Sequence, residues 1–334
     1  MVATIKDIAR ASGVSTATVS RVINHLGGYS KEVELKVLKI AKELGYRKNE
    51  NAISLVKNTT KTIGVIMPDV ATSFYGNIVN GIEDKAYDSG YSVILTHAGI
   101  EGKRLQESLN LMAERRVDGL IIFSLNLSAQ DINTIDSLDI PLLLLSTKAE
   151  NTEIPFIKVD DYSASYAAVE YLIGKGHTKI GLAGVNAEDP IAGKPRIQGY
   201  LNALEDHQIQ LNLDLIKQGD FSFESGKAAM SELIAQKQAI TAVFCVSDET
   251  ALGVLSVCYT SGLNVPNDIS VVGYDNSTVS QMSIPPLTTI AQPFYDMGSI
   301  GCESLLASIA TGKNIDSQII PFQLIERNSV NAII

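Results

Sequence analysis

The sequence predicts a small all-α helix-turn-helix head followed by a large two-lobed α/β body built on doubly wound parallel sheets. Near the N-terminus, apolar residues recur at helical spacing in three short segments, each preceded by Thr or Ser. From residue 61 onward, short apolar strands alternate with amphipathic stretches. This part is too long for a single sheet of that kind, so two similar lobes are expected.

The charge is divided unevenly along the chain. Residues 1–61 hold eleven Lys and Arg against five Asp and Glu, net +6, whereas the remaining residues hold 16 basic and 32 acidic groups, net −16. A basic module beside an acidic body is typical of a protein whose small part faces a polyanion. A cluster of ordinary solvent-exposed helix charges is the plain alternative.

Composition and missing motifs exclude several classes of protein. The 45% hydrophobic and 19% charged content is that of a globular protein. Neither a long apolar run nor an export signal is found, so we expect a cytoplasmic location and no membrane contact. Cys245, Cys258 and Cys302 are expected to be core thiols. The motifs of phosphate-binding loops, serine hydrolases and zinc proteases are missing, so we expect no catalysis, cofactor or metal.

The first two helices of the head are predicted from their caps. Thr4 is expected to cap a helix over 5–11, with Asp7 at its third position, and Gly13 to form the turn. Ser15 is expected to cap the second helix, which turns Val19, Val22 and Ile23 inward. The residues left facing outward are Thr16, Ala17, Ser20, Arg21 and Asn24.

A third helix is predicted after Ser30, ending at Gly45. The apolar residues that it is expected to bury are Val33, Val37, Ile40, Ala41 and Leu44. Three short helices with a glycine-containing turn make a helix-turn-helix. The small, polar outer face of its second helix suits entry into a DNA major groove, and a protein partner is the alternative.

The segments 4–9 and 13–24 resemble the head of the LacI/GalR family of transcriptional repressors. The resemblance implies that Thr16 and Ala17 read bases, that Arg21 also enters the groove and that Asn24 lies near the DNA backbone. The full set of expected DNA contacts is Thr4, Ser15, Thr16, Ala17, Ser20, Arg21, Asn24 and Leu55.

The segment 46–55 resembles the hinge helix of that family. The resemblance implies that Leu55 wedges between base steps in the minor groove. Ten residues are too few for a stable isolated helix, so its folding is expected to be coupled to DNA. Lys48 stands where the family usually has proline, and Ile53 where it usually has arginine.

The body is predicted to contain nine strands, at 63–67, 92–96, 120–123, 142–145, 157–159, 180–183, 242–246, 270–274 and 288–291. The family resemblance continues here, for example in 64–69, 176–180, 196–200 and 273–276. It implies a body like a periplasmic sugar-binding protein. The expected domains are a head, 1–48, a hinge and linker, 49–60, and a body, 61–334, with lobe 1 about 61–160 and 292–322 and lobe 2 about 161–291 and 323–334.

Ligands of doubly wound sheets bind beyond the carboxyl ends of the strands. Asp69 and Ser73 follow the first strand, and His97, Ser124 and Ser146 follow later ones. By resemblance, effector contacts also fall on Phe74, Asp160, Arg196, Phe221, Ser247, Asp275 and Gln292. One arginine, several carboxylates and two aromatic rings suit a polyol. Asp160 and Asp248 are also the leading candidates for helix caps.

One head reads half a site, so a two-fold homodimer on a palindromic double-stranded DNA operator is expected, with a sugar or sugar phosphate between the lobes. A stripe of Tyr75, Ile78, Val79 and Ile82 is expected either in the dimer interface or on the sheet. One alternative is a carbon-catabolite regulator of the same family with a phosphoprotein corepressor, for which segment 75–89 offers little basic charge. A sugar-binding receptor without a DNA role is the remote alternative.

Overall fold

The computed structural model describes residues 3–46, 59–68, 74–99, 102–149, 152–237 and 239–333. The chain divides into two compact units, residues 1–60 and 61–334. Within the described ranges, no helix is both long and apolar enough to cross a bilayer.

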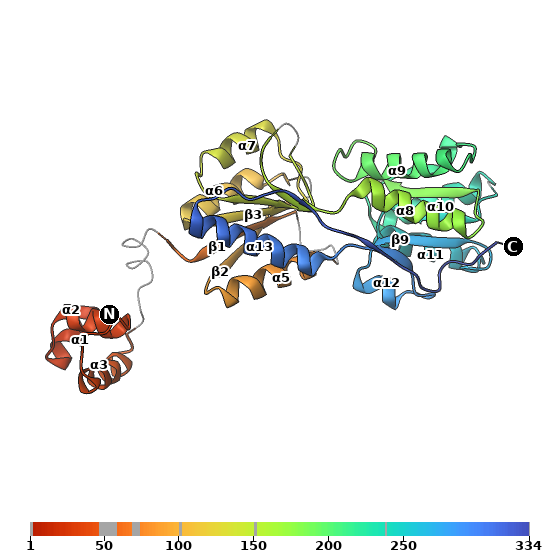
Figure 1. Ribbon diagram of the computed structural model, residues 1–334. Coiled ribbons are helices and arrows are strands. Elements are labelled where there is room, and N and C mark those ends of the chain that lie inside the picture. The colour runs from red at the N-terminus through yellow and green to blue at the C-terminus, as the bar shows by residue number, and fades with distance from the viewer. Residues whose placement is uncertain are drawn as a thin grey trace. The chain divides into compact units, whose positions relative to one another are not determined.

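The first unit contains helices α1 (Ile5–Ser12), α2 (Thr16–Ile23) and α3 (Lys31–Glu43) (Figure 1). The three predicted caps are confirmed: Thr4, Ser15 and Ser30 each accept a backbone N–H from the first turn of their helix. Gly13 ends α1 in the left-handed region with a φ of 68°, which glycine adopts without strain. The predicted helix-turn-helix is therefore present.

A small apolar core holds the three helices of this head together. Ile8, Val19, Val22 and Val37 are fully buried in it, and the partly buried Val33 and Ile40 pack against them. The prediction that Leu44 is buried is wrong, because α3 ends at Glu43 and the Leu44 side chain is 43% exposed.

The second unit contains two six-stranded sheets, in the orders β11-β5-β4-β3-β1-β2 and β12-β10-β9-β8-β6-β7. All neighbours are parallel except β12, which runs antiparallel to β10. The strands are β1 (Thr62–Met67), β2 (Ser92–His97), β3 (Gly119–Phe123), β4 (Leu142–Leu145), β5 (Phe156–Lys158), β6 (Ile180–Val185), β7 (Ile216–Gln218), β8 (Ala242–Cys245), β9 (Ser270–Asp275), β10 (Thr288–Ala291), β11 (Gln318–Ile319) and β12 (Gln323–Ile325).

Each sheet forms the centre of one lobe, and the two lobes lie side by side (Figure 1). The chain passes between them after β5, after β10 and between β11 and β12. All nine predicted strands are present, with ends that differ by at most two residues. The edge strands β7, β11 and β12, of two or three residues each, were not predicted.

Helices cover both sheets, as doubly wound folds require. They are α5 (Tyr75–Asp88), α6 (Leu105–Arg115), α7 (Ala129–Asp136), α8 (Asp161–Gly174), α9 (Gly193–Asp206), α10 (Phe223–Ala235), α11 (Asp248–Thr260), α12 (Thr278–Met282) and α13 (Phe294–Thr311), with a 3₁₀ turn at Leu213–Leu215. Helices α5 and α13 pack very closely. A Cβ atom at Gly81 or Gly298 would overlap a backbone carbonyl of the facing helix.

The apolar stripe on α5 lies inside the first lobe. Tyr75, Ile78 and Ile82 are buried in its core, and Val79 packs against that core. Of the two roles predicted for this stripe, packing on the sheet is confirmed, and three of its side chains are therefore unavailable to a partner subunit. The three cysteines are likewise buried and free, and burial raises the pKa of Cys258 and Cys302 to about 12.

Candidate functional site

Helix α2 presents the outer face on which most of the expected DNA contacts lie. Thr16, Ala17 and Arg21 are exposed, while Ser20 and Asn24 are half-buried. Asn24 Nδ2 donates to the backbone oxygen of Ser20 at 2.9 Å. Thr16 and Ala17 have small side chains, which allows close approach of the helix to a duplex.

Thr4 and Ser15 use their hydroxyl groups in the helix caps. Thr4 Oγ1 donates to Asp7 Oδ2 at 2.7 Å, and Ser15 Oγ accepts the Thr18 N–H at 3.0 Å. Both residues lie at helix N-termini, where backbone N–H groups favour a phosphate. Leu55, the expected minor-groove wedge, lies outside the described residues.

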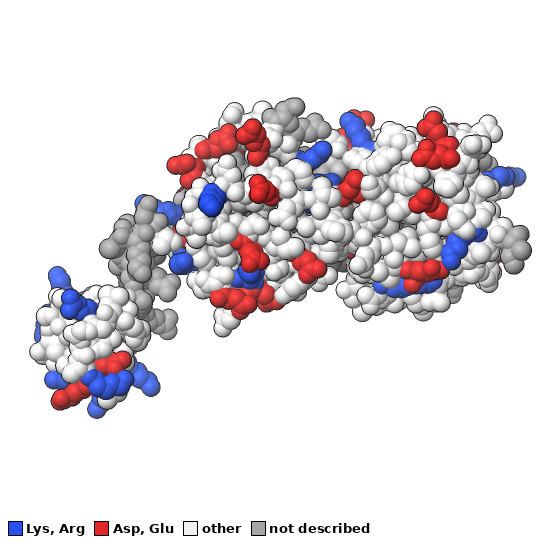
Figure 2. All heavy atoms as spheres, in the orientation of Figure 1, with Lys and Arg blue, Asp and Glu red and all other residues white. Residues whose placement is uncertain are grey.

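The head also carries many basic side chains, some of them paired with acidic neighbours. Arg10, Lys31 and Lys39 pair with acidic neighbours on their own helices at 2.8–3.9 Å, and all three side chains are highly exposed. In the described part of the head, no acidic partner is found for Lys6, Arg21, Lys36 and Lys42. Figure 2 shows basic side chains at several places on the head and acidic ones spread over both lobes of the body.

A cleft of about 520 Å³ lies at the carboxyl ends of the strands in both lobes. Its volume is within the range of small-molecule sites. The first lobe and the returning helix α13 contribute Pro68, Phe74, Tyr75, Ser124, Leu125, Asn126, Ser146, Thr147, Lys158, Gln292 and Phe294. The second lobe contributes Asp161, Asp189, Ile191, Ala192, Arg196, Asp220, Phe221, Ser222, Ser247, Glu249, Asp275 and Ser277.

Most of the expected effector-binding residues line this cleft. Phe74, Arg196, Phe221, Ser247, Asp275 and Gln292 are all among the lining residues, as are Ser124 and Ser146. Asp69 and Ser73 lie outside the described residues. His97 is not in the lining and instead meets the Arg104 guanidinium at 2.7 Å.

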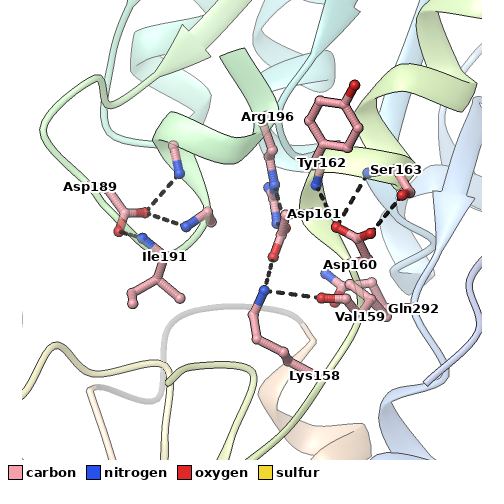
Figure 3. A network of polar contacts seen from close by, with 12 residues as sticks. Lys158, Val159, Asp160, Asp161, Tyr162, Ser163, Asp189, Ile191, Arg196 and Gln292 are labelled. Carbon is pink, nitrogen blue, oxygen red and sulfur yellow. Dashed lines mark hydrogen bonds and ion pairs between the residues drawn. The ribbon is translucent and has the colours of Figure 1, made fainter. Parts of the chain in front are cut away.

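The prediction that Asp160 contacts the effector is wrong. Asp160 is the N-cap of α8, where Oδ1 accepts the N–H groups of Tyr162 and Ser163 and Oδ2 accepts the Ser163 hydroxyl. Its carboxylate therefore faces its own helix and is not in the lining (Figure 3). The next residue, Asp161, faces the cleft in its place. Asp160 was also predicted as a helix cap, and the structure confirms that role.

Asp161 is the centre of a buried charge network (Figure 3). Lys158 Nζ donates to its Oδ2 at 2.7 Å, while Arg196 Nε and Nη2 lie 2.8 and 2.7 Å from its Oδ1. The Tyr274 hydroxyl donates to the same Oδ1 at 3.1 Å. Burial opposes the ionisation of Asp161, but the charges of Arg196 and Lys158 outweigh it and lower its pKa.

Several groups of the protein hold Arg196 in place. Besides Asp161, its guanidinium donates to the backbone oxygen of Val246 and lies 3.7 Å from the centre of the Tyr274 ring. Burial disfavours its charge, but Asp161 more than compensates and raises the pKa of Arg196. The family resemblance predicted this arginine as a ligand contact, but not that Asp161, itself bonded to Lys158, would hold it.

Asp275 lines the same cleft and has a strained backbone. Its φ of 114° lies in a region that residues other than glycine rarely adopt, which is typical of functional sites. Gln292 Nε2 donates to its Oδ1 at 2.8 Å. Burial raises the pKa of Asp275 well above its usual range, although the nearby Arg196 acts in the other direction.

Aromatic rings form an apolar part of the cleft wall. Phe74 stacks on Phe294 with ring centres 4.5 Å apart and planes 14° apart. Phe221 lies across the cleft lining with its ring centre 5.7 Å from the Arg196 guanidinium carbon. Flat rings next to hydrogen-bonding groups suit the apolar face and the hydroxyl groups of a sugar.

Two serines in the lining differ in what they can offer. The Ser247 hydroxyl caps α11 and donates to the Phe221 backbone oxygen at 2.6 Å, so its proton is already used. Ser146 Oγ is buried and has no hydrogen-bond partner among the described residues. A buried hydroxyl of this kind is costly unless a ligand or water satisfies it.

Comparison with known proteins shows which family has this combination of a helix-turn-helix head and a two-lobed body. Residues 4–49 match the family described as bacterial regulatory proteins, lacI family, and residues 60–328 match periplasmic binding proteins and the sugar binding domain of the LacI family. Catabolite control protein A of Priestia megaterium is 35% identical over 317 residues, 95% of each chain.

Solved structures agree with the fold. The lac repressor dimer bound to operator and the anti-inducer ONPF has a TM-score of 0.89 at 31% identity, covering 99% of this chain and 100% of that one. The complex of the transcriptional regulator CelR with cellobiose has a TM-score of 0.75 at 29% identity, covering 98% and 99%. The chain belongs to the LacI family, whose members are bacterial transcriptional regulators with a DNA-binding head and a sugar-binding body rather than enzymes.

Proposed function

We propose that this protein is a cytoplasmic repressor that binds a palindromic operator as a homodimer and whose operator affinity is set by a small carbohydrate between its lobes. In the head, the unpaired cations supply attraction to phosphates, and Thr16, Ala17 and Arg21 on α2 supply base readout. Thr4, Ser15, Ser20 and Asn24 contact or position the DNA backbone.

The observation that carries the effector assignment is the cleft lined from both lobes. Stacked rings, a Ser146 hydroxyl without a partner among the described residues and the Asp275–Gln292 pair offer the mixture of apolar and hydrogen-bonding surface that a sugar requires. The similarity to a regulator solved with cellobiose supports the same ligand class. The proposed contacts are Asp69, Ser73, Phe74, Ser146, Arg196, Phe221, Ser247, Asp275 and Gln292.

Exposed apolar side chains in both lobes support the homodimer. In the second lobe Ile284 is 92% and Met282 74% exposed, and in the first lobe Leu95 is 44% exposed. Leu95 lies on β2, which is the edge strand of its sheet in the described part of the chain. Such edges and patches are unfavourable unless a partner covers them. The similarity to a lac repressor dimer agrees with this assignment.

Closure of the two lobes is the proposed link between sugar binding and operator binding. A sugar that binds one closure more tightly than the other shifts the population toward it and alters the separation of the two hinges in the dimer. When the hinges separate, Leu55 leaves the minor groove and operator affinity falls.

A Leu55→Ala variant is expected to lose specific DNA binding far more than nonspecific DNA binding. Equal losses on operator and random duplexes would contradict the wedge role.

The surface of α5 disfavours a phosphoprotein corepressor. Its one lysine, Lys85, pairs with Glu303 of α13 at 2.9 Å, and Asp84 accepts the Tyr295 hydroxyl. Glu83 and Asp88 add further negative charge. A phosphorylated partner requires unpaired basic groups, and this face is acidic.

The direct experiment selects DNA from a random duplex library with the purified full-length chain. We expect palindromic sequences to be enriched and bound by two chains per duplex, as measured by sedimentation. A thermal-shift screen against mono- and disaccharides and their phosphates then identifies the effector. Enrichment of no sequence, or binding of one chain per duplex, would refute the proposal.

A further inference from the structure

Among the described residues that line the cleft, two cations share one counter-ion. Lys158 and Arg196 both bond to Asp161, from opposite sides of its carboxylate, at 2.7–2.8 Å (Figure 3). All three side chains are at least nine-tenths buried. The positive charge of the cleft is therefore partly neutralised before any ligand enters.

The rest of the lining adds negative charge. Besides Asp161, the described part of the lining contains four carboxyl groups, those of Asp189, Asp220, Glu249 and Asp275. Even with Asp275 protonated, four carboxylates face two cations. A phosphorylated ligand would enter this field with up to two further negative charges, at a cost that low-dielectric surroundings increase.

Hydrogen-bond donors nevertheless remain for an uncharged ligand. Arg196 has five N–H groups, of which Asp161 and the Val246 backbone oxygen take three. Lys158 has three, of which Asp161 and the Val159 backbone oxygen take two. The remaining N–H groups have no partner within the described part of the chain. They can bind the oxygen atoms of hydroxyl groups without any net charge on the ligand.

We propose that Asp161 is a specificity-determining residue that makes the cleft select an uncharged sugar over its phosphate ester. By bonding to both cations at once, it leaves their N–H donors usable but removes the excess positive charge that a phosphate needs. Lys158 and Asp161 act together, with Lys158 holding the carboxylate in place from the first lobe. This inference rests on the proposed function, because it assigns the charge of the ligand bound in the same cleft.

The test compares matched ligands on the full-length chain. Isothermal titration gives the affinity for a sugar that the wild-type protein binds, for the phosphate ester of that sugar and for inorganic phosphate. The variants are Asp161→Asn, Asp161→Glu, which restores the charge, and Asp214→Asn, which removes an exposed carboxylate outside the cleft lining. Circular dichroism and operator binding verify that each variant folds.

We expect the wild-type protein to prefer the uncharged sugar by at least about tenfold, and Asp161→Asn to lower that ratio by about tenfold or more. Asp161→Glu should regain most of the preference, and Asp214→Asn should keep it. A merely structural role for Asp161 would weaken both ligands in proportion. An unchanged ratio in a folded Asp161→Asn variant, or equal wild-type affinity for the ester, would overturn the inference.

Two further arms separate this inference from the proposed function. If Asp161→Asn does not fold, Lys158→Met replaces it with the opposite expectation, because removing a cation should raise the preference for the uncharged sugar, and no rise overturns the inference. If the wild-type protein binds no carbohydrate, the proposed effector class fails. Inorganic phosphate then still tests the charge argument, with a thermal shift expected for Asp161→Asn and none for the wild type.

Discussion

Replacing Arg196 with methionine tests whether the buried charge network stabilises the body. The substitution keeps a side chain of similar length but removes both contacts with Asp161, the bond to the Val246 backbone oxygen and the cation–π contact with Tyr274. Asp161 then keeps Lys158 at 2.7 Å and the Tyr274 hydroxyl at 3.1 Å.

The structure sets the size of the expected loss. Breaking a buried ion pair by removing one partner costs about 3–5 kcal/mol, because the other charge is left uncompensated. Since Lys158 still neutralises Asp161, we expect a value at the lower end, about 3 kcal/mol. For a unit of this size that corresponds to a fall in Tm of about 6 °C.

Thermal and urea unfolding, followed by circular dichroism, measure this loss in the full-length chain. Lys194→Met, a change to an exposed residue on the same helix, is the matched control and should alter stability by less than about 0.5 kcal/mol. An Arg196→Met variant whose stability is within 1 kcal/mol of the wild-type value would show that the network is energetically neutral and would refute the reasoning.

Three other substitutions test separate parts of the molecule. Burial raises the pKa of Asp248 from 3.8 to about 6. Between these two pH values the folded state holds a proton that the unfolded state has lost, so the free energy of unfolding should fall by about 3 kcal/mol as pH rises from about 4 to 6. Asp248→Asn should lack this fall, and parallel pH profiles of the two proteins in urea unfolding would contradict it. Ile8→Ala removes a fully buried side chain from the small core of the head and should lower the stability of the head by about 2–5 kcal/mol. It should abolish operator binding while leaving sugar-induced thermal shifts intact. Operator affinity equal to wild type would argue against the head as the DNA-binding unit. Asp275→Ala should remove the effector response but spare the operator complex, and an unchanged dose response in a gel-shift titration would exclude this residue from the site.

Local chemistry made the head and the strands predictable. Thr4, Ser15 and Ser30 precede apolar runs of helical period, and a cap followed by such a run defines a helix start without tertiary information. Leu44 was misassigned because the period alone does not show where the last turn leaves the core. Strands such as β11 and β12 form only because the chain passes between the lobes there, so no local pattern predicts them.

The cleft was predictable in position but not in its electrostatics. Phe74, Arg196 and Asp275 follow predicted strands or lie in matching motifs, so topology places them together. The role of Lys158 was not predicted, since a lysine at the end of a strand usually reaches solvent. In the structure, Asp161 at the start of the following helix accepts a hydrogen bond from Lys158. The available sequence signal was the pair Asp160-Asp161 directly after a strand, of which the first residue caps the helix and the second is free to bond to Lys158.

The central claim is that one dimeric protein couples a sugar in its cleft to a palindromic operator at its heads. Fluorescence anisotropy of the full-length chain on a selected operator, measured at several salt concentrations with and without the cleft ligand, tests it most directly. We expect tight, salt-sensitive binding of two chains per duplex and at least about a tenfold change in affinity when the sugar is added. Binding that shows no preference for any palindrome, or that the sugar leaves unchanged, would contradict the account.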